Sequence, residues 1–244
     1  MNNLNLLLNL PIAHRGLHND LIPENTIHAI DSAFKNNFNC EIDVRLTKDN
    51  KVIVFHDDSL LRLCGIDRFV NDLTYEEIKN YEISKSSETI PLLTDVLKII
   101  PNNKILLIEL KNMNLPGTLE ELVLEEIRNY HDRVCLQSFS PFTTTWFKRK
   151  TRNIPVGFIT SDFQDEEINV FTKFFLTRKL LVKYIKPDFL SVDININPKK
   201  ISFFKKLDLP ILTWTIDSFE MLNKSKDFSN NIIFEKINPF SYDT

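Results

Sequence analysis

The segment that decides the fold is Asn39–Leu46, which reads NCEIDVRL. It has the length of a β-strand, and side chains two positions apart on a strand share a face. Glu41 and Asp43 therefore point to one side. Ile42 and Val44 point to the other side, where an apolar layer of helices can cover them. The strand thus carries charge on one face, close to its C-terminal end.

Strand-like and helical patterns alternate outward from this segment along the chain. Helical patterns cover 25–36, 92–100, 119–130, 141–151, 169–185, 198–207 and 218–228. In the first of them Ile27, Ile30 and Phe34 recur on one face, and Asn25 is the expected N-cap. The other strand candidates are 11–14, 104–110, 133–139, 155–160, 189–193, 210–215 and 231–235. This alternation predicts an α/β fold, an eight-stranded parallel β/α barrel, with residues 1–244 forming a single domain.

One segment interrupts the alternation. Residues 52–55 have a strand pattern, but only residues 48–51 separate them from the second strand. Such a gap is too short for a crossover helix and favours an antiparallel hairpin. We therefore expect a hairpin above the barrel mouth, followed by a small insertion at about 57–91. Thr74 and Glu77 have the spacing of a capping box, which predicts a short helix within it.

The composition excludes several classes of partner. The 30 basic and 33 acidic residues give a net charge of −3, which argues against a nucleic-acid partner. No apolar run approaches the length of a membrane span, and residues 1–8 lack the basic start of a signal peptide. The three cysteines form no Cys-x-x-Cys pair, so no structural zinc site is expected. These features predict a cytoplasmic protein without stable membrane attachment, and they leave its oligomeric state open.

Three carboxylates are expected at one barrel mouth. Glu41, Asp43 and Glu109 stand near the C-terminal ends of two strands, where barrel enzymes place their active sites. Grouped together, they would repel one another and lose hydration, a conflict that a divalent cation removes. Oxygen ligands suit Mg²⁺ or Ca²⁺. The alternative is a structural ion network with Arg15 or with Lys111, which shares a face with Glu109.

Histidines end two of the predicted strands. His14 ends the first strand and His56 ends the hairpin strand. Histidine titrates near neutral pH, so a pair on opposite sides of a phosphate could serve as general base and general acid. Arg15 adds a planar guanidinium suited to phosphate oxygens. Taken singly, each histidine is equally compatible with a structural role.

The remaining polar candidates are weaker. His18 follows the first strand and is expected near the mouth, whereas His28 and His131 are expected to be surface or packing residues. Gln137 and Trp214 lie near two further strand ends, where an amide and an aromatic ring could line a small polar ligand. Packing in the core would explain Trp214 equally well.

Seven short motifs follow one another in order. They are His14-Arg15-Gly16, Pro23-Glu24-Asn25-Thr26, Glu41-x-Asp43-Val44, His56-Asp57, Glu109-x-Lys111, Gln137-Ser138-Phe139 and Trp214-Thr215. In this order and spacing, from about residue 12 to residue 238, the chain resembles the glycerophosphodiester phosphodiesterase family. Any one motif is weak, but the ordered set is specific.

The resemblance implies roles for these residues. Glu41, Asp43 and Glu109 would bind one divalent cation, Mg²⁺ or Ca²⁺. His14 and His56 would form the acid–base pair, while Arg15 and Lys111 would hold the phosphate. The family hydrolyses glycerophosphodiesters, small molecules, to sn-glycerol 3-phosphate and an alcohol.

The end of the chain departs from the family pattern. The family commonly closes with a Gly-rich strand and a Thr-Asp or Thr-Asn pair, whereas residues 231–236 here read NIIFEK. We expect Glu235 and Lys236 to reshape the pocket on that side.

Two alternative functions stay open. A lysophospholipase D-like lipid phosphodiesterase can share the barrel, but it would need an exposed apolar rim or a basic amphipathic helix, and neither is clear in the sequence. A non-catalytic ligand-binding barrel is disfavoured because the two histidines and three carboxylates are all present.

Overall fold

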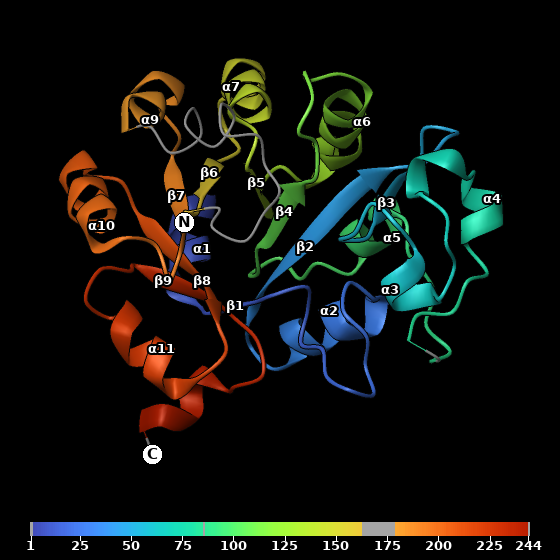
Figure 1. The fold of residues 1–244 in the computed structure, drawn as a ribbon, viewed down its shortest axis with the longest axis horizontal. Coiled ribbons are helices and arrows are strands. Elements are labelled where there is room, and N and C mark those ends of the chain that lie inside the picture. The colour runs from blue at the N-terminus through green and yellow to red at the C-terminus, as the bar shows by residue number, and fades with distance from the viewer. Residues whose placement is uncertain (1, 85, 163–178, 244) are drawn as a thin grey trace.

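The protein, described here by a computed structural model over residues 2–84, 86–162 and 179–243, forms a closed barrel of parallel strands (Figure 1). The barrel closes because β1 (Ile12–Ala13) pairs in parallel with both its neighbours, β2 and β9. The other barrel strands are β2 (Asn39–Leu46), β4 (Leu106–Leu110), β5 (Val134–Ser138), β6 (Val156–Thr160), β7 (Phe189–Asp193), β8 (Ile211–Ile216) and β9 (Asn231–Phe234). The predicted eight-stranded parallel barrel is therefore confirmed.

Helices surround the barrel as the apolar periodicity predicts (Figure 1). They are α2 (Ile27–Lys35), α5 (Leu93–Lys98), α6 (Thr118–Glu126), α7 (Pro141–Lys150), α9 (Lys179–Ile185), α10 (Pro198–Phe204) and α11 (Phe219–Ser225), with 3₁₀ turns at Ile127–Tyr130, Lys205–Leu207 and Pro239–Asp243. Ile42 and Val44 of β2 are buried in the same apolar cluster as Ile30 and Phe34 of α2. The first part of the helix expected at 169–185 lies outside the described residues.

The predicted hairpin and insertion are also present. β3 (Val52–Val54) pairs antiparallel with the end of β2. The insertion that follows contains α3 (Leu61–Cys64), a 3₁₀ turn (Val70–Asp72) and α4 (Tyr75–Ile78), and it has an apolar cluster of its own. The capping box at the start of α4 is formed, because the Thr74 backbone N–H donates to Glu77 Oε2 at 2.8 Å.

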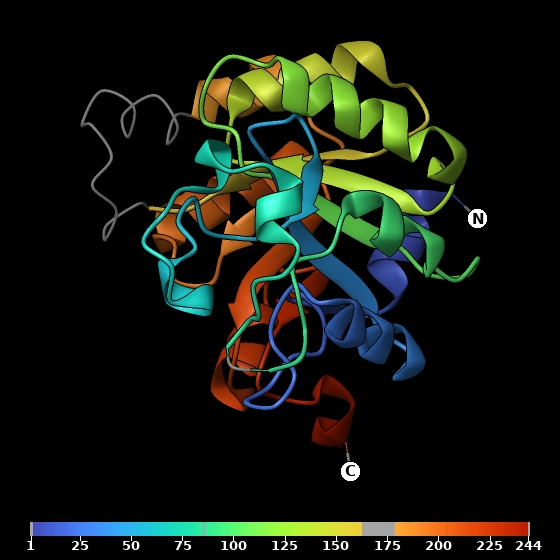
Figure 2. The same cartoon turned by 90° about the vertical axis from the view of Figure 1, so that its right-hand side faces the viewer.

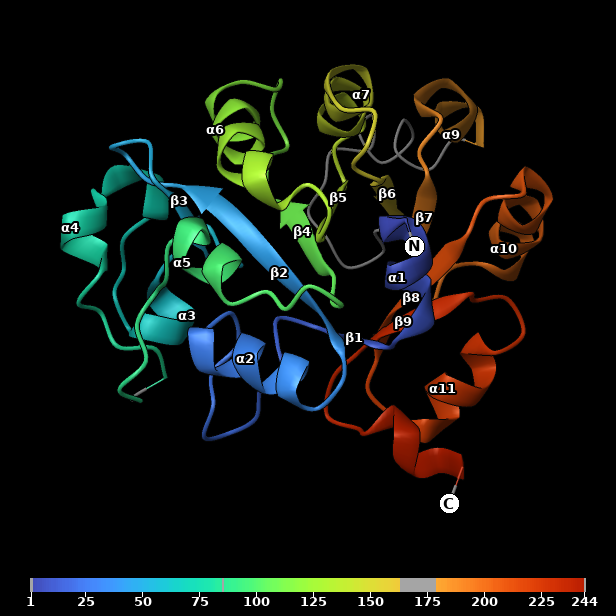
Figure 3. The same ribbon diagram turned by 180° about the vertical axis from the view of Figure 1, so that it is seen from behind.

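The chain begins with a helix that the sequence did not predict. α1 (Asn3–Asn9) lies across the N-terminal end of the barrel (Figure 3), opposite the insertion (Figure 2). Leu7 is fully buried in the apolar cluster of the barrel interior. Two strand asparagines hold the helix: Asn39 Nδ2 donates to Leu6 O at 3.0 Å, and Asn231 Nδ2 donates to Leu7 O at 2.7 Å. Among the described residues, no helix has the length and apolarity needed to cross a bilayer.

The expected N-cap of α2 was wrong by one residue. Thr26 is the N-cap, and its hydroxyl oxygen accepts from the Ala29 N–H at 3.2 Å. Asn25 instead has a left-handed backbone, with φ of 58°, and its side chain reaches Asp43. Asparagine tolerates both situations, so sequence pattern alone cannot separate them.

Candidate active site

The strands bring the three predicted carboxylates together. Asp43 on β2 lies directly beside Glu109 on β4, and Glu41 lies two residues earlier on the same face as Asp43. One carboxylate oxygen from each of the three residues lies within 4.8 Å of the other two, and all three residues are buried. The convergence expected from the period-two pattern is present.

Burial and mutual repulsion set the charges of this cluster. Burial, together with the nearby charges of Asp43 and Glu109, raises the pKa of Glu41 well above its usual value. Burial acts the same way on Asp43, but Lys111, His56 and Arg15 outweigh it and hold the Asp43 pKa far below its usual value. The three buried carboxylates therefore cannot all be ionised without strong mutual repulsion. An all-oxygen donor set of this kind fits Mg²⁺ or Ca²⁺, whose charge would offset that repulsion.

Two cations lie against the carboxylates. Arg15 Nε is 3.2 Å from Asp43 Oδ2, and Lys111 Nζ is 3.1 Å from Asp43 Oδ1 and 2.5 Å from Glu109 Oε1. The backbone turns through the left-handed region at Arg15, whose φ is 54°, and at the next residue, Gly16, whose φ is 84°. A Cβ on Gly16 would lie 2.6 Å from the Ala29 carbonyl carbon, so the turn requires glycine.

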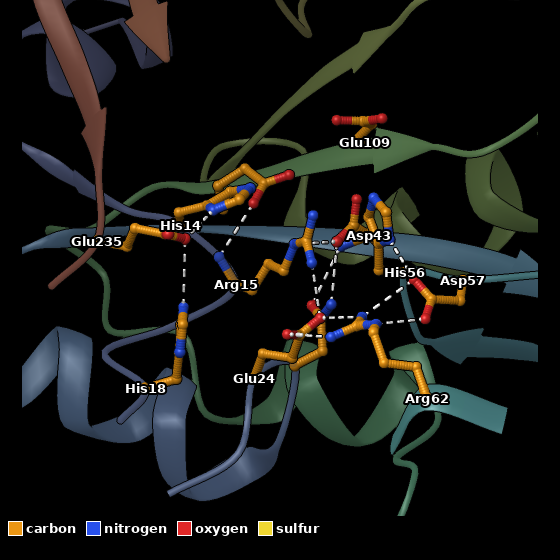
Figure 4. Close-up of polar contacts among 12 residues, drawn as sticks. His14, Arg15, His18, Glu24, Asp43, His56, Asp57, Arg62, Glu109 and Glu235 are labelled. Atoms are coloured by element: carbon orange, nitrogen blue, oxygen red, sulfur yellow. Dashed lines mark hydrogen bonds and ion pairs between the residues drawn. The ribbon is translucent and has the colours of Figure 1, made fainter. Parts of the chain in front are cut away.

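Each predicted histidine has a carboxylate on Nδ1. His14 Nδ1 is 2.9 Å from Glu235 Oε2, and His56 Nδ1 is 2.6 Å from Asp57 Oδ1 (Figure 4). Burial lowers the pKa of His14, and it lowers the pKa of His56 to about 4. Both imidazoles are therefore neutral near pH 7. A carboxylate that accepts from Nδ1–H leaves Nε2 as the nitrogen able to accept a proton.

These groups line a single cavity of about 160 Å³. It is lined by His14, Arg15, Glu41, His56, Glu109 and Lys111. Gln137, Phe139 and Trp214 complete its wall. Gln137 Oε1 accepts from the Ser191 hydroxyl at 2.6 Å, and the Trp214 ring packs edge-on against Phe139. The structure thus places every predicted site residue in or beside one cavity.

Sequence analysis missed a chain of ion pairs that starts at Arg15, in the wall of this cavity. Arg62 from the insertion binds Glu24 at 2.8 Å and Asp57 at 2.6 Å, and Glu24 also binds Arg15 at 2.7 Å (Figure 4). These ion pairs link the loop after β1 to the hairpin and the insertion. Glu24 and Asp57 lie inside the quoted motifs, which was the available signal, but nothing in the sequence pointed to Arg62.

The other histidines differ in position. His28 is mostly exposed on α2, and His131 is exposed after the 3₁₀ turn that follows α6, as expected. His18 lies beside Glu235, with its Nε2 atom 3.7 Å from Glu235 Oε2. Glu235 therefore stands between two histidines (Figure 4).

The chain thus folds as an eight-stranded β/α barrel whose mouth gathers three carboxylates, two neutral histidines and two cations. The chain belongs to the glycerophosphoryl diester phosphodiesterase family, whose model matches residues 14–230. The family and fold that the motifs predicted are thus confirmed. The roles of the individual site residues stay predictions.

Curated relatives carry related names. A glycerophosphodiester phosphodiesterase of Bacillus altitudinis is 36% identical over 163 residues, a match that covers 62% of this chain and 66% of that protein, just under two thirds of its length. A glycerophosphodiester phosphodiesterase of Caldanaerobacter subterraneus is 28% identical over 227 residues, 88% of each chain. A human lysophospholipase D is 32% identical over 126 residues, 46% of this chain and 40% of that protein.

Solved structures share the fold. A glycerophosphodiester phosphodiesterase of Thermotoga maritima has a TM-score of 0.72 and 26% identity, and the match covers 93% of this chain and 94% of that one. An Oleispira antarctica phosphodiesterase, solved with the product sn-glycerol-3-phosphate, has a TM-score of 0.75 and 22% identity, with 93% of each chain covered.

Proposed function

We propose that the protein hydrolyses glycerophosphodiesters to sn-glycerol 3-phosphate and an alcohol, in a cation-dependent reaction at this cavity. The observation that carries the proposal is that two histidines, each with a carboxylate on Nδ1, line the same cavity as the carboxylate cluster. Membership of the family supports the same substrate class.

Glu41, Asp43 and Glu109 would hold the cation. Their oxygens converge, and the ion would neutralise charge that burial now resists. When bound, Mg²⁺ or Ca²⁺ supplies Lewis-acid polarisation of a phosphate oxygen.

The cavity's cations would orient the phosphate. Arg15 and Lys111 lie against Asp43 and line the cavity, so both can reach an anion placed there. The ion pairs of Arg15 with Asp43 and Glu24 fix its guanidinium, which limits the entropy lost when substrate binds.

The histidines would move the protons. One histidine accepts the proton of the attacking hydroxyl through Nε2. The other takes up a proton at Nε2, which the negative charge of the bound phosphate favours, and donates that proton to the departing alcohol oxygen. We propose that the attacking group is the 2-hydroxyl of glycerol. Its oxygen bonds to phosphorus as the bond to the alcohol breaks, and water then opens the cyclic phosphate to glycerol 3-phosphate.

Release of glycerol 3-phosphate from a panel of glycerophosphodiesters, with and without divalent cations, tests the proposal. We expect cation-dependent release from glycerophosphocholine and glycerophosphoethanolamine. No release from any member of the panel, with either cation present, would overturn it.

A second candidate, a lysophospholipase D-like activity, is favoured by one structural feature. A groove of about 680 Å³ runs from Lys111 and is lined by Phe69 and Leu115, whose exposed fractions are 53% and 75%. The sequence showed no clear apolar rim, and these side chains supply a partial one. The groove also carries Arg45, Asp58 and Asp72, which suit a polar alcohol group.

The two candidates differ in the alcohol group that they release. We propose that small water-soluble diesters are the main substrates and that the protein works in the cytoplasm; its three cysteines are free thiols. Comparison of kcat/KM on glycerophosphocholine and lysophosphatidylcholine decides between them. A clear preference for the lysolipid would select the second candidate.

A further inference from the structure

We propose that His14, His18 and Glu235 form a second metal site, one that selects Zn²⁺ and whose occupation inhibits the enzyme. The inhibition rests on the proposed function, because it assumes that His14 transfers protons, whereas the metal binding does not. The site is distinct from the three-carboxylate cluster in both residues and donor chemistry.

The geometry of the three side chains suits a small ion. One ligand atom from each residue lies within 4.8 Å of the other two. Glu235 Oε2 is 2.9 Å from His14 Nδ1 and 3.7 Å from His18 Nε2. Ligands at about 2.0–2.1 Å from a tetrahedral zinc are roughly 3.3–3.4 Å apart, so each of the two histidine–glutamate distances lies within about 0.5 Å of the separation that the ion needs.

The existing contacts leave the required ligand atoms available. His18 Nε2 is buried and has no hydrogen-bond partner among the described residues. Lys236 binds the other carboxylate oxygen, Glu235 Oε1, at 2.9 Å, which leaves Oε2 facing the histidines. Figure 4 shows Glu235 between His14 and His18. The metal would replace only the hydrogen bond between His14 and Glu235.

The donor set selects the metal. Two imidazole nitrogens and one carboxylate oxygen suit Zn²⁺, whereas three carboxylates suit Mg²⁺ or Ca²⁺. For a site with nitrogen ligands, Zn²⁺ binds more tightly than Mg²⁺ at equal concentration. Excess Mg²⁺ should therefore fill the three-carboxylate cluster and leave the histidine site to zinc.

Zinc at this site would block proton transfer by His14. Coordination through Nδ1 moves the imidazole proton to Nε2, because a neutral imidazole carries one proton in total. Nε2 then has no lone pair free to accept a proton. The Nε2–H group of the zinc-bound imidazole is also a far weaker acid than the Nε2–H group of an imidazolium. His14 is therefore disabled whether it serves as base or as acid.

The test measures zinc binding by the whole protein in competition with a zinc-sensitive dye, in millimolar Mg²⁺. We compare wild type with His18→Ala, with His18→Asn as a second variant of similar polarity, and with His28→Ala, which removes an exposed histidine outside the site. Wild type and His28→Ala should bind one zinc with equal affinity. Both His18 variants should bind zinc at least about tenfold more weakly. Removing a residue that only hydrogen-bonds to a metal ligand already weakens metal binding by about this factor, and removing a ligand itself should cost at least as much. Equal zinc affinity in all four proteins would overturn the site.

The inhibition is measured as the ratio of rates with and without zinc within each variant. We expect a low ratio for wild type and His28→Ala, and a ratio near one for the His18 variants. Equal inhibition in all of them would place the inhibitory zinc elsewhere and overturn this part of the proposal. If no diester is hydrolysed but zinc affinity depends on His18, the metal site stands while the proposed function fails.

Discussion

Replacing Glu126 with glutamine tests one partly buried charge outside the proposed catalytic cavity. Glu126 ends α6, and its Oε2 atom is buried without a hydrogen-bond partner among the described residues. Burial raises the pKa of this carboxyl to about 7, and the charge of Lys51 only partly opposes that rise. Near pH 8 the folded protein must therefore hold a poorly hydrated carboxylate. Glutamine has nearly the same shape and carries no charge.

The sign and size of the effect follow from linkage. The Glu126 carboxyl has a pKa near 4.5 in the unfolded chain and about 7 in the folded protein. Its contribution to the free energy of unfolding is therefore fully present below about pH 4.5 and is lost as the pH rises through about 7. For a fully buried carboxyl, a pKa difference of this size corresponds to about 3 kcal/mol of unfolding free energy. The carboxylate is partly exposed and therefore partly screened, so we expect roughly 1–2 kcal/mol.

Urea unfolding at about pH 5 and pH 8 measures the effect. Glu126→Gln should stabilise the protein by roughly 1–2 kcal/mol at pH 8 and by much less at pH 5, which corresponds to a Tm increase of about 2–8 °C at the higher pH. Glu121→Gln removes the same charge from an exposed position of the same helix that does not shift the Glu126 pKa, and it should show no such pH dependence. Equal stabilisation by Glu126→Gln at both pH values would refute the reasoning.

Four further predictions concern the cavity and the barrel floor. Excess chelator should abolish turnover and added Mg²⁺ or Ca²⁺ should restore it; full activity in chelator would contradict a cation-dependent reaction. His14→Ala and His56→Ala should each lower kcat by about 10²–10⁴ in a glycerol 3-phosphate release assay, with His28→Ala as the matched control, and a wild-type rate would exclude the role. A substrate without the glycerol 2-hydroxyl should not turn over, and an unchanged rate would rule out the cyclic route. Asn39→Ala should lower the free energy of unfolding by about 1–3 kcal/mol in urea, because it leaves the buried Ile105 N–H without its acceptor; wild-type stability would contradict this.

Local periodicity was sufficient to predict the barrel and the carboxylate cluster. The period of two places Glu41 and Asp43 on one face of β2, and parallel pairing places Glu109 beside Asp43. These relations depend only on neighbouring residues and on strand order. The hairpin followed from the short gap before residue 52, which no crossover helix could fill.

Several contacts that sequence analysis missed join distant parts of the chain. Arg62 reaches Glu24 across 38 residues, and Asn3 reaches the Val134 carbonyl across 131. No local pattern encodes such pairings, because they depend on where the barrel brings loops together. Asn25 shows the same limit: its sequence position suited a helix cap, but Asp43 lies close enough to bind its side chain instead.

Barrel closure itself assembles the proposed acid–base site. His14 follows β1, and Glu235 follows β9, so the two are 221 residues apart and meet only because β1 pairs with β9. The His14 backbone N–H also donates to the Phe234 carbonyl at 2.9 Å, which fixes the register of that pairing. The partner of His56, by contrast, is the adjacent residue, Asp57. Opening of the seam between β1 and β9 would therefore separate His14 from its carboxylate while leaving the His56 pair intact, so the two histidines depend on different parts of the fold.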